Sequence, residues 1–128
     1  MEDLKQYIER HRKNEEKKSD FITYLYALME ERGYKKDSDF YNKANISKQT
    51  FSNLKNENIT PQLNTVLKIV FALKCTNHEC KYLLKKAGFT LASSSQYALI
   101  IRYCLENKIY ELWKVNEYLQ QYGYDIIA

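Results

Sequence analysis

The scarcity of turn-forming residues is the feature that most limits how this chain can fold. Its 128 residues include three glycines and one proline, too few for the many tight turns of a β-sandwich or β-barrel. Apolar residues make up 45% of the sequence, which excludes a disordered chain, and in most segments they recur every three or four positions. The length suits one domain with a substantial core. We therefore predict an all-α protein.

The same spacing, together with capping signals, divides the chain into helices. The first is predicted at residues 2–18, and the second begins after Ser19 or Asp20 and ends at Gly33. Pro61, which follows Thr60, is expected at the first position of a later helix, where proline is favoured. The tail YGYDII, residues 122–127, is the one hint of a short strand. The remaining helices are predicted from Asp37 or Ser38 to Ala44, after a cap at Ser47, at 61–73, at 77–87 before Gly88, from Ser93–Ser95 to Leu105, and around 112–119.

The segment ANISKQTFSNLKN, residues 44–56, carries fewer apolar residues than a helix that merely covers a core. We expect Phe51 and Leu54, three positions apart, to hold the helix against the core while its other side chains face solvent. Asn45 is expected in the left-handed backbone region, which asparagine tolerates best after glycine, and Ile46 is expected to enter the core. Two short helices joined in this way form a helix-turn-helix.

The stretch SDFYNKANISKQTFSNLKN, followed after a short loop by TPQLNTVLKIVFALKCT, resembles the Cro/repressor-type (XRE-like) helix-turn-helix proteins. The family's proline and its Thr-(Leu/Val)-x-x-Ile-x-x-Ala-Leu run are represented by Pro61, Thr65, Val66, Ile69, Ala72 and Leu73. The resemblance covers about residues 20–88. It implies a five-helix repressor-type domain at residues 19–92, with an extra N-terminal helix at 1–18 and a C-terminal helical hairpin at 93–128.

The resemblance also implies which residues contact DNA, because the second helix of such a pair lies in the major groove. Lys48, Gln49 and Asn53 are the candidates for base contacts, since glutamine and asparagine pair two-pronged with adenine and lysine donates to guanine. Tyr41 replaces a residue that is small in the family, so we expect altered packing between the two helices. The candidates for phosphate contacts are Lys43, Ser47, Thr50, Lys55 and Thr60.

Two functions follow from this resemblance. The first is a sequence-specific, double-stranded DNA-binding transcriptional regulator of the repressor kind. The alternative is a protein-interaction adaptor or inhibitor that keeps the repressor fold without specific DNA binding. The dependence of DNA binding on salt separates the two, because contacts to several phosphates give a steep slope.

Positive charge is concentrated beside the predicted helix-turn-helix. The net charge of the chain is +4, and residues 59–92 alone carry five basic residues and one acidic residue. Residues 19–58 are balanced, with six of each sign, although residues 43–56 contain three lysines and no acidic residue. This excess of positive charge is modest, and it favours binding of a polyanion such as DNA.

No sequence pattern indicates catalysis, a cofactor or a membrane segment. A nucleophile elbow, a phosphate-binding glycine loop and a His–carboxylate arrangement are all missing, so we do not expect an enzyme. No apolar run approaches a membrane span, and three cysteines fit a reducing cytoplasm. Cys75, His78, Cys80 and Cys104 lack the closely paired spacing of zinc ligands, so we expect buried core thiols rather than a metal site.

The segment 93–128 adds a helical hairpin to a domain that is complete near residue 88. Residues 87–119 resemble an extension that follows this domain in a group of bacterial proteins. Two roles are open for it. The hairpin either packs on the domain and enlarges its core, or leaves aromatic side chains exposed for a homodimer interface. Twofold symmetry suits a module that reads one half-site. The aromatic residues concerned are Tyr97, Tyr103, Tyr110, Trp113, Tyr118, Tyr122 and Tyr124.

Overall fold

The computed structural model describes residues 2–10, 21–56, 61–92 and 94–128, and its regular secondary structure is helical. Residues 4–10 form the first helix, and none of the described residues belongs to a strand, which confirms the all-α class. The helices that follow are α2 (Phe21–Glu31), α3 (Asp37–Lys43), α4 (Lys48–Lys55), α5 (Leu63–Ala72), α6 (Asn77–Lys86), α7 (Gln96–Glu106) and α8 (Leu112–Gln121).

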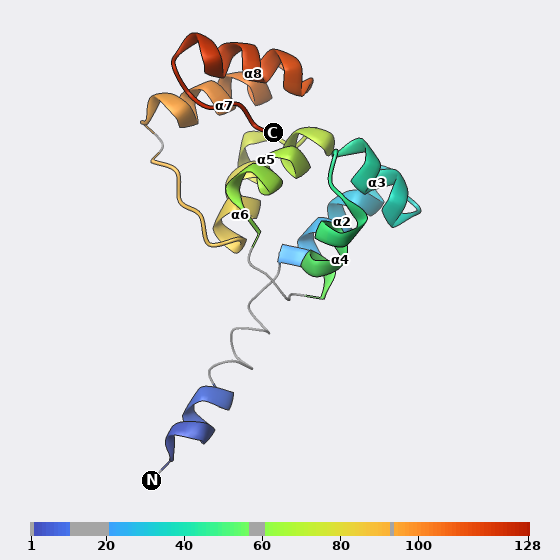
Figure 1. Ribbon diagram of the computed structural model, residues 1–128, viewed down its shortest axis with the longest axis vertical. Coiled ribbons are helices and arrows are strands. Elements are labelled where there is room, and N and C mark those ends of the chain that lie inside the picture. Colours follow the sequence, from blue (N-terminus) through green and yellow to red (C-terminus); the bar gives the residue numbers. More distant parts are fainter. Residues whose placement is uncertain (1, 11–20, 57–60, 93) are drawn as a thin grey trace.

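The α5–α6 pair lies at the centre of the fold (Figure 1). Helices α2, α3 and α4 lie on one side of this pair, and the α7–α8 hairpin lies on the other. Helix α6 contacts α2, α5 and α7. A single buried cluster runs through all of them, from Leu25 in α2 through Leu67 and Leu83 to Val115 in α8. The hairpin and the helix-turn-helix therefore share one core.

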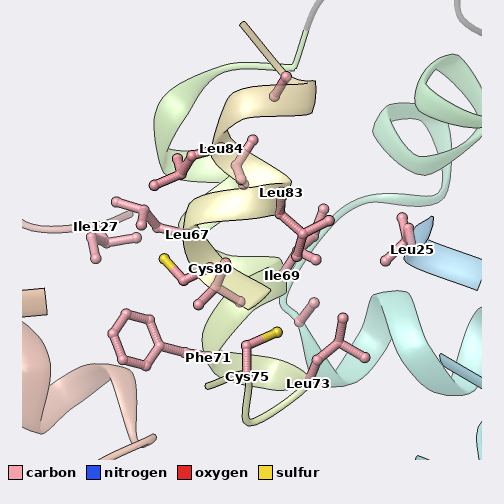
Figure 2. Close-up of a cluster of buried hydrophobic side chains, with 14 of the residues drawn as sticks. Leu25, Leu67, Ile69, Phe71, Leu73, Cys75, Cys80, Leu83, Leu84 and Ile127 are labelled. Carbon is pink, nitrogen blue, oxygen red and sulfur yellow. The ribbon is translucent and has the colours of Figure 1, made fainter. Parts of the chain in front are cut away.

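Three free cysteines belong to this core, as the sequence predicted. Figure 2 shows Cys75 and Cys80 among the apolar side chains between α5 and α6. Both are at most 2% exposed, and burial raises the pKa of each thiol to about 12, so both stay protonated. Cys104, on α7, is also buried. Across the described residues, no three His, Cys, Asp or Glu side chains are grouped so that they could hold a metal ion.

Most of the described helices end in the same way. A residue with positive φ follows the helix, and the next amide donates to the carbonyl five residues earlier, as in a Schellman motif. After α3, for example, Asn45 has φ 56° and the Ile46 amide lies 2.9 Å from the Tyr41 carbonyl. From the sequence, helix ends with a left-handed residue were predicted at glycines and at Asn45. In the structure, two further helices end with a left-handed lysine. The residues with positive φ are Gly33, Asn45, Lys74, Gly88, Lys108 and Gly123.

The C-terminal tail is not the short strand that its sequence suggested, since residues 122–127 have no strand partner. Instead, the side chain of Asn116 in α8 satisfies its backbone. The Ile127 amide donates to Asn116 Oδ1 at 2.7 Å, and Asn116 Nδ2 donates to the Ile127 carbonyl at 3.0 Å. This pairing turns Ile127, which is 2% exposed, into the core on the side of Leu67 (Figure 2).

One predicted helix start is wrong. The N-cap of α5 is Gln62, so Pro61 precedes the cap instead of occupying the first helical position. Gln62 has extended backbone angles, and Pro61 lies in this entry segment, where no helical hydrogen bond is required of it. The start of α7 agrees with the prediction, since Ser95 Oγ accepts the Ala98 amide at 3.1 Å. Predicted features at 11–18, Ser19, Asp20, Thr60 and Ser93 lie outside the described residues.

An ion pair fastens α2 to the junction of α5 and α6. Arg32 Nη2 lies 2.6 Å from Glu79 Oε1, and Arg32 Nε donates to the Leu73 carbonyl at 3.0 Å. Glu79 also closes the capping box of α6, because it accepts the Thr76 amide at 2.9 Å. Burial alone would raise the pKa of Glu79, but the Thr76 amide and the Arg32 guanidinium outweigh it and lower that pKa below its usual value.

Candidate nucleic-acid interface

Helices α3 and α4 form the helix-turn-helix that the sequence predicted. Asn45 has the left-handed conformation, and Ile46 is 6% exposed and reaches the core. On α4, Phe51 and Leu54 are each 2% exposed. Lys68, in α5, donates to the Asn45 carbonyl at 3.1 Å and so ties the turn to the next helix. The orientation of α4 is thus fixed by its two apolar residues and by the turn before it.

The space between α3 and α4 is filled by aromatic rings. Tyr41, in α3, packs against Phe51 of α4 with ring centroids 5.7 Å apart. Phe40, also in α3, packs against Phe51 with ring centroids 6.0 Å apart. A tyrosine therefore occupies the contact where the proteins that this segment resembles have a small residue, and the two helices are held together by ring packing.

The N-terminal end of α4 is closed by its own side chains. Ser47 Oγ accepts the Thr50 amide at 3.0 Å, as expected for an N-cap. The Ser47 hydroxyl also donates to Thr50 Oγ1 at 2.9 Å. The Ser47 hydroxyl thus uses its hydrogen within the cap. The Thr50 hydroxyl hydrogen is the one left to be donated to an outside acceptor.

The three residues predicted to contact bases lie together on α4. Lys48 and Gln49 are exposed in the first turn, and Asn53 is half-buried one turn after Gln49. Gln49 Nε2 donates to Asn53 Oδ1 at 3.1 Å, so the two amides form a linked pair. Gln49 Oε1 and the Asn53 amide hydrogens remain available to a partner. No acidic residue lies on α4.

Lys55, at the C-terminal end of α4, pairs with an acidic residue from outside the segment 43–56. Its ammonium lies 3.7 Å from Asp37 Oδ2 at the start of α3. The same carboxylate accepts the Tyr26 hydroxyl at 3.0 Å. Burial, followed by this hydrogen bond, raises the pKa of Tyr26 to about 12. The Lys55–Asp37 pair is exposed, so a phosphate can compete for the lysine at little cost.

Further lysines gather where α3 ends. Lys43 is exposed in the last turn of α3 and lines a shallow hollow with Lys68 and Lys74. Glu111, before α8, lines the same hollow. Lys68 and Lys74 were not among the residues predicted to contact phosphate. The sequence signal that pointed to them was the excess positive charge of residues 59–92, which gave no individual position. Thr60, the remaining predicted phosphate contact, lies outside the described residues.

The α7–α8 hairpin presents a different surface. Of its aromatic side chains, Tyr103, Trp113 and Tyr122 are exposed, whereas Tyr97, Tyr110, Tyr118 and Tyr124 are partly buried against the core. Tyr103 and Tyr118 meet edge to face with centroids 5.8 Å apart. The Lys114 ammonium lies 5.1 Å from the Tyr118 ring and 5.9 Å from the Trp113 ring. We use the name aromatic patch for the side chains of Leu99, Tyr103, Trp113 and Tyr118 on the α7–α8 hairpin, which are exposed or partly buried.

Comparison with known protein families matches residues 25–79 to the Cro/C1-type HTH DNA-binding domain. The matched range runs from α2 into the first turn of α6 and includes the whole helix-turn-helix. No match was found among curated proteins or among solved structures. Within the part of the chain that the structure describes, no helix is both long enough and apolar enough to span a membrane.

Proposed function

We propose that this XRE-like protein, whose residues 25–79 form a Cro/C1-type helix-turn-helix domain, is a sequence-specific transcriptional regulator that binds double-stranded DNA and acts as a repressor. The observation that carries the proposal is the division of α4 into two faces. Phe51 and Leu54 anchor one face in the core, and Lys48 and Gln49 stand exposed on the other, on a helix without acidic residues. Such a helix suits the major groove. A cytoplasmic location is part of the proposal, in keeping with three free thiols.

Base contacts are assigned to Lys48, Gln49 and Asn53. The hydrogen bond between Gln49 and Asn53 holds both side chains in place and leaves an acceptor and a donor outward. An adenine presents the complementary N6 donor and N7 acceptor in the major groove. Because the amides are already ordered, less side-chain entropy is lost when DNA binds. Lys48, beside them, supplies a donor for a guanine.

Phosphate contacts are assigned to residues that flank this face. Thr50 offers its free hydroxyl hydrogen, and Ser47 contributes through the start of the helix, where backbone amides favour an anion. Lys43 extends the positive edge towards Lys68 and Lys74. Lys55 joins by exchanging Asp37 for a phosphate, and Thr60 completes the proposed set.

The test is selection of binding sites from a random duplex pool, followed by titration of the selected site at several salt concentrations. Lys48→Ala with Gln49→Ala should weaken binding to that site by about 1–3 kcal/mol for each lost base contact. Both residues are exposed, so unfolding should change by less than about 0.5 kcal/mol. Lys85→Ala with Gln121→Ala removes the same residue types outside α4, on α6 and α8, and serves as the control. Unchanged affinity of the α4 variant at matched salt would refute the assignment.

The alternative function, an adaptor or inhibitor that keeps the repressor fold, is favoured by one observation. Asp37 neutralises Lys55 beside α4, and residues 19–58 have no net charge. A chain of this second kind selects no site from the pool, and its binding to any duplex shows no steep salt dependence.

We further propose that the regulator is a homodimer joined through the aromatic patch. Trp113 is 67% exposed and Tyr103 is 51% exposed, although both belong to a type of residue that carries much of the energy of protein interfaces. A twofold axis would place two α4 helices on successive major-groove faces, about 34 Å apart. Light scattering at tens of micromolar should give a dimer for the intact chain and a monomer for Trp113→Ala. Removal of the hairpin is a poorer test, because Ile127 and Val115 belong to the shared core.

A further inference from the structure

A groove lies between α6 and α7, away from the helix-turn-helix. It has a volume of about 550 Å³, within the range of small-molecule sites. Helix α6 lines it with one face, α7 lines it with another, and residues 89–92 close it along the connection between the two helices. The groove belongs neither to the proposed DNA contacts on α4 nor to the aromatic patch.

The floor of this groove is apolar. Leu84 and Ile101 are almost fully buried beneath it, and Phe89 and Leu91 form partly buried walls. Ala98, on α7, is half-buried and leaves room because its side chain is a single methyl group. An apolar body that enters the groove therefore removes additional apolar surface from water on both sides.

The rim of the groove is cationic. Lys81, Lys85 and Arg102 line it, and no acidic residue does. Arg102 is held by Glu106, with Nε 2.7 Å from Oε1. Lys81 and Lys85 are exposed and have no ion-pair partner among the described residues. A ligand that leaves a negative group at the rim would thus meet two uncompensated ammonium groups one helical turn apart.

We propose that this groove binds a small amphipathic anion, namely an organic carboxylate with a medium-length acyl chain. The acyl chain lies between Leu84 and Ile101, and the carboxylate lies at the rim between Lys81 and Lys85. Asn77 and Thr90 offer further hydrogen-bonding groups in the lining. Duplex DNA does not fit the apolar floor, since its phosphates lie on a wide polar surface. The inference is independent of the function proposed for α4.

Calorimetric titration of the intact protein with decanoate, below its micelle concentration, tests the proposal. Decanol is the matched control, because it has the same chain length without the charge. We expect one decanoate per chain, with decanol bound at least about tenfold more weakly. In amide NMR spectra, decanoate should shift the signals of Leu91 and Ala98 and leave those of Gln49 unchanged.

Two variants separate the rim from the floor. Lys81→Gln with Lys85→Gln should weaken decanoate binding at least about tenfold, because both attractive charges are lost. Lys35→Gln with Lys36→Gln removes two exposed lysines from the segment before α3 and should leave binding unchanged. Ala98→Trp should fill the groove and abolish binding; if that variant fails to fold, the lysine pair still decides.

Three results would overturn the proposal. The first is the absence of binding at millimolar decanoate, and the second is equal affinity for decanoate and decanol or for the two lysine variants. The third is a wild-type dimer that becomes monomeric in the Ala98→Trp variant and stays dimeric in the Trp113→Ala variant. That result would assign the groove to a second copy of the chain.

Discussion

The helix-turn-helix and the C-terminal hairpin lie on opposite sides of α5 and α6, and they treat their large apolar side chains differently (Figure 1). In α3, the turn and α4, Phe40, Ile46, Phe51 and Leu54 are all at most 6% exposed. In the hairpin, Val115 and Leu119 are equally buried, yet residues of the aromatic patch such as Trp113 remain in solvent. One surface is therefore polar, and the other is aromatic.

This difference indicates which kind of partner each surface suits. The exposed side chains of α4 are amides and lysines, which recognise base edges and phosphates through directed hydrogen bonds. The aromatic patch offers exposed rings beside the Lys114 ammonium, and aromatic side chains are enriched in protein interfaces. A variant that changes one surface should consequently leave the function of the other intact, provided that the core they share stays folded.

Phe51→Ala should have the largest effect on stability of the variants considered. Phe51 is 2% exposed and packs against Phe40, Tyr26 and Tyr41, so its truncation leaves a cavity. We expect a loss of about 3–5 kcal/mol from the free energy of unfolding. A domain of this size has about 5–15 kcal/mol in total, so the melting temperature should fall sharply.

Trp113→Ala is the contrasting variant on the hairpin. It removes an even larger ring, but one that is 67% exposed, so the unfolding free energy of the monomer should change by less than about 0.5 kcal/mol. Chemical unfolding, measured at a concentration low enough to keep the chain monomeric, compares the two variants. Equal losses would show that the two surfaces are not distinguished by burial.

Helix positions were largely predictable from the sequence, because they depend on local spacing and local caps. Ser47 and Ser95 cap α4 and α7 as expected, and Asn45 has the left-handed angle that its residue type favours. The left-handed ends at Lys74 and Lys108 were missed, since lysine carries no preference for that conformation. The strand suggested at 122–127 was wrong because Asn116, on another element, satisfies the tail.

Contacts between distant residues were beyond the reach of the sequence. The pairing of Lys55 with Asp37 alters the charge beside α4, yet no local pattern joins two residues on different helices. The hydrogen bond between Gln49 and Asn53 is local, but it too was not predicted, because an i, i+4 spacing permits such a bond without requiring it. Spacing alone also left open which hairpin aromatics would be buried, since it marks a face as apolar but not what covers it.

Glu79→Gln tests a second difference between the helix-turn-helix side of the fold and the hairpin. Each side has an ion pair of similar length, but the two pairs differ in exposure. Arg32 and Glu79 are 2.6 Å apart with side chains 21% and 16% exposed, whereas Arg102 and Glu106 are 2.7 Å apart and half exposed. Loss of the Glu79 charge weakens hydrogen bonds to Arg32 and Thr76, so we expect about 1.5–3 kcal/mol lower stability. Glu106→Gln, in the hairpin, should leave the melting temperature unchanged.

The contribution of Glu79 should depend on pH in a defined direction. The pKa of Glu79 is lower in the folded chain than in the unfolded chain. An unperturbed glutamate titrates at about 4.3. The stabilisation is therefore complete above that unfolded value and is lost as the pH falls through the folded pKa. Thermal melts of wild type and Glu79→Gln should differ most at neutral pH and converge in acid. A gap that persists at pH values below both pKa values would assign the effect to packing.

Lys108→Gly should produce a small change, and in the direction of greater stability. Lys108 follows α7 with φ 56°, the same angle as Asn45 after α3, and the Ile109 amide donates to the Cys104 carbonyl at 2.8 Å. A lysine in this conformation costs about 1–2 kcal/mol that glycine avoids, while glycine loses about 0.5–1 kcal/mol through its more flexible unfolded chain. We expect a net gain of about 0.5–1 kcal/mol. Asn45→Gly should stay within about 0.5 kcal/mol of wild type, because asparagine already tolerates the left-handed region. Urea unfolding of both variants measures the difference. An equal gain at both positions would mean that Asn45 is as strained as Lys108, so that the turn of the helix-turn-helix has no advantage over that of the hairpin.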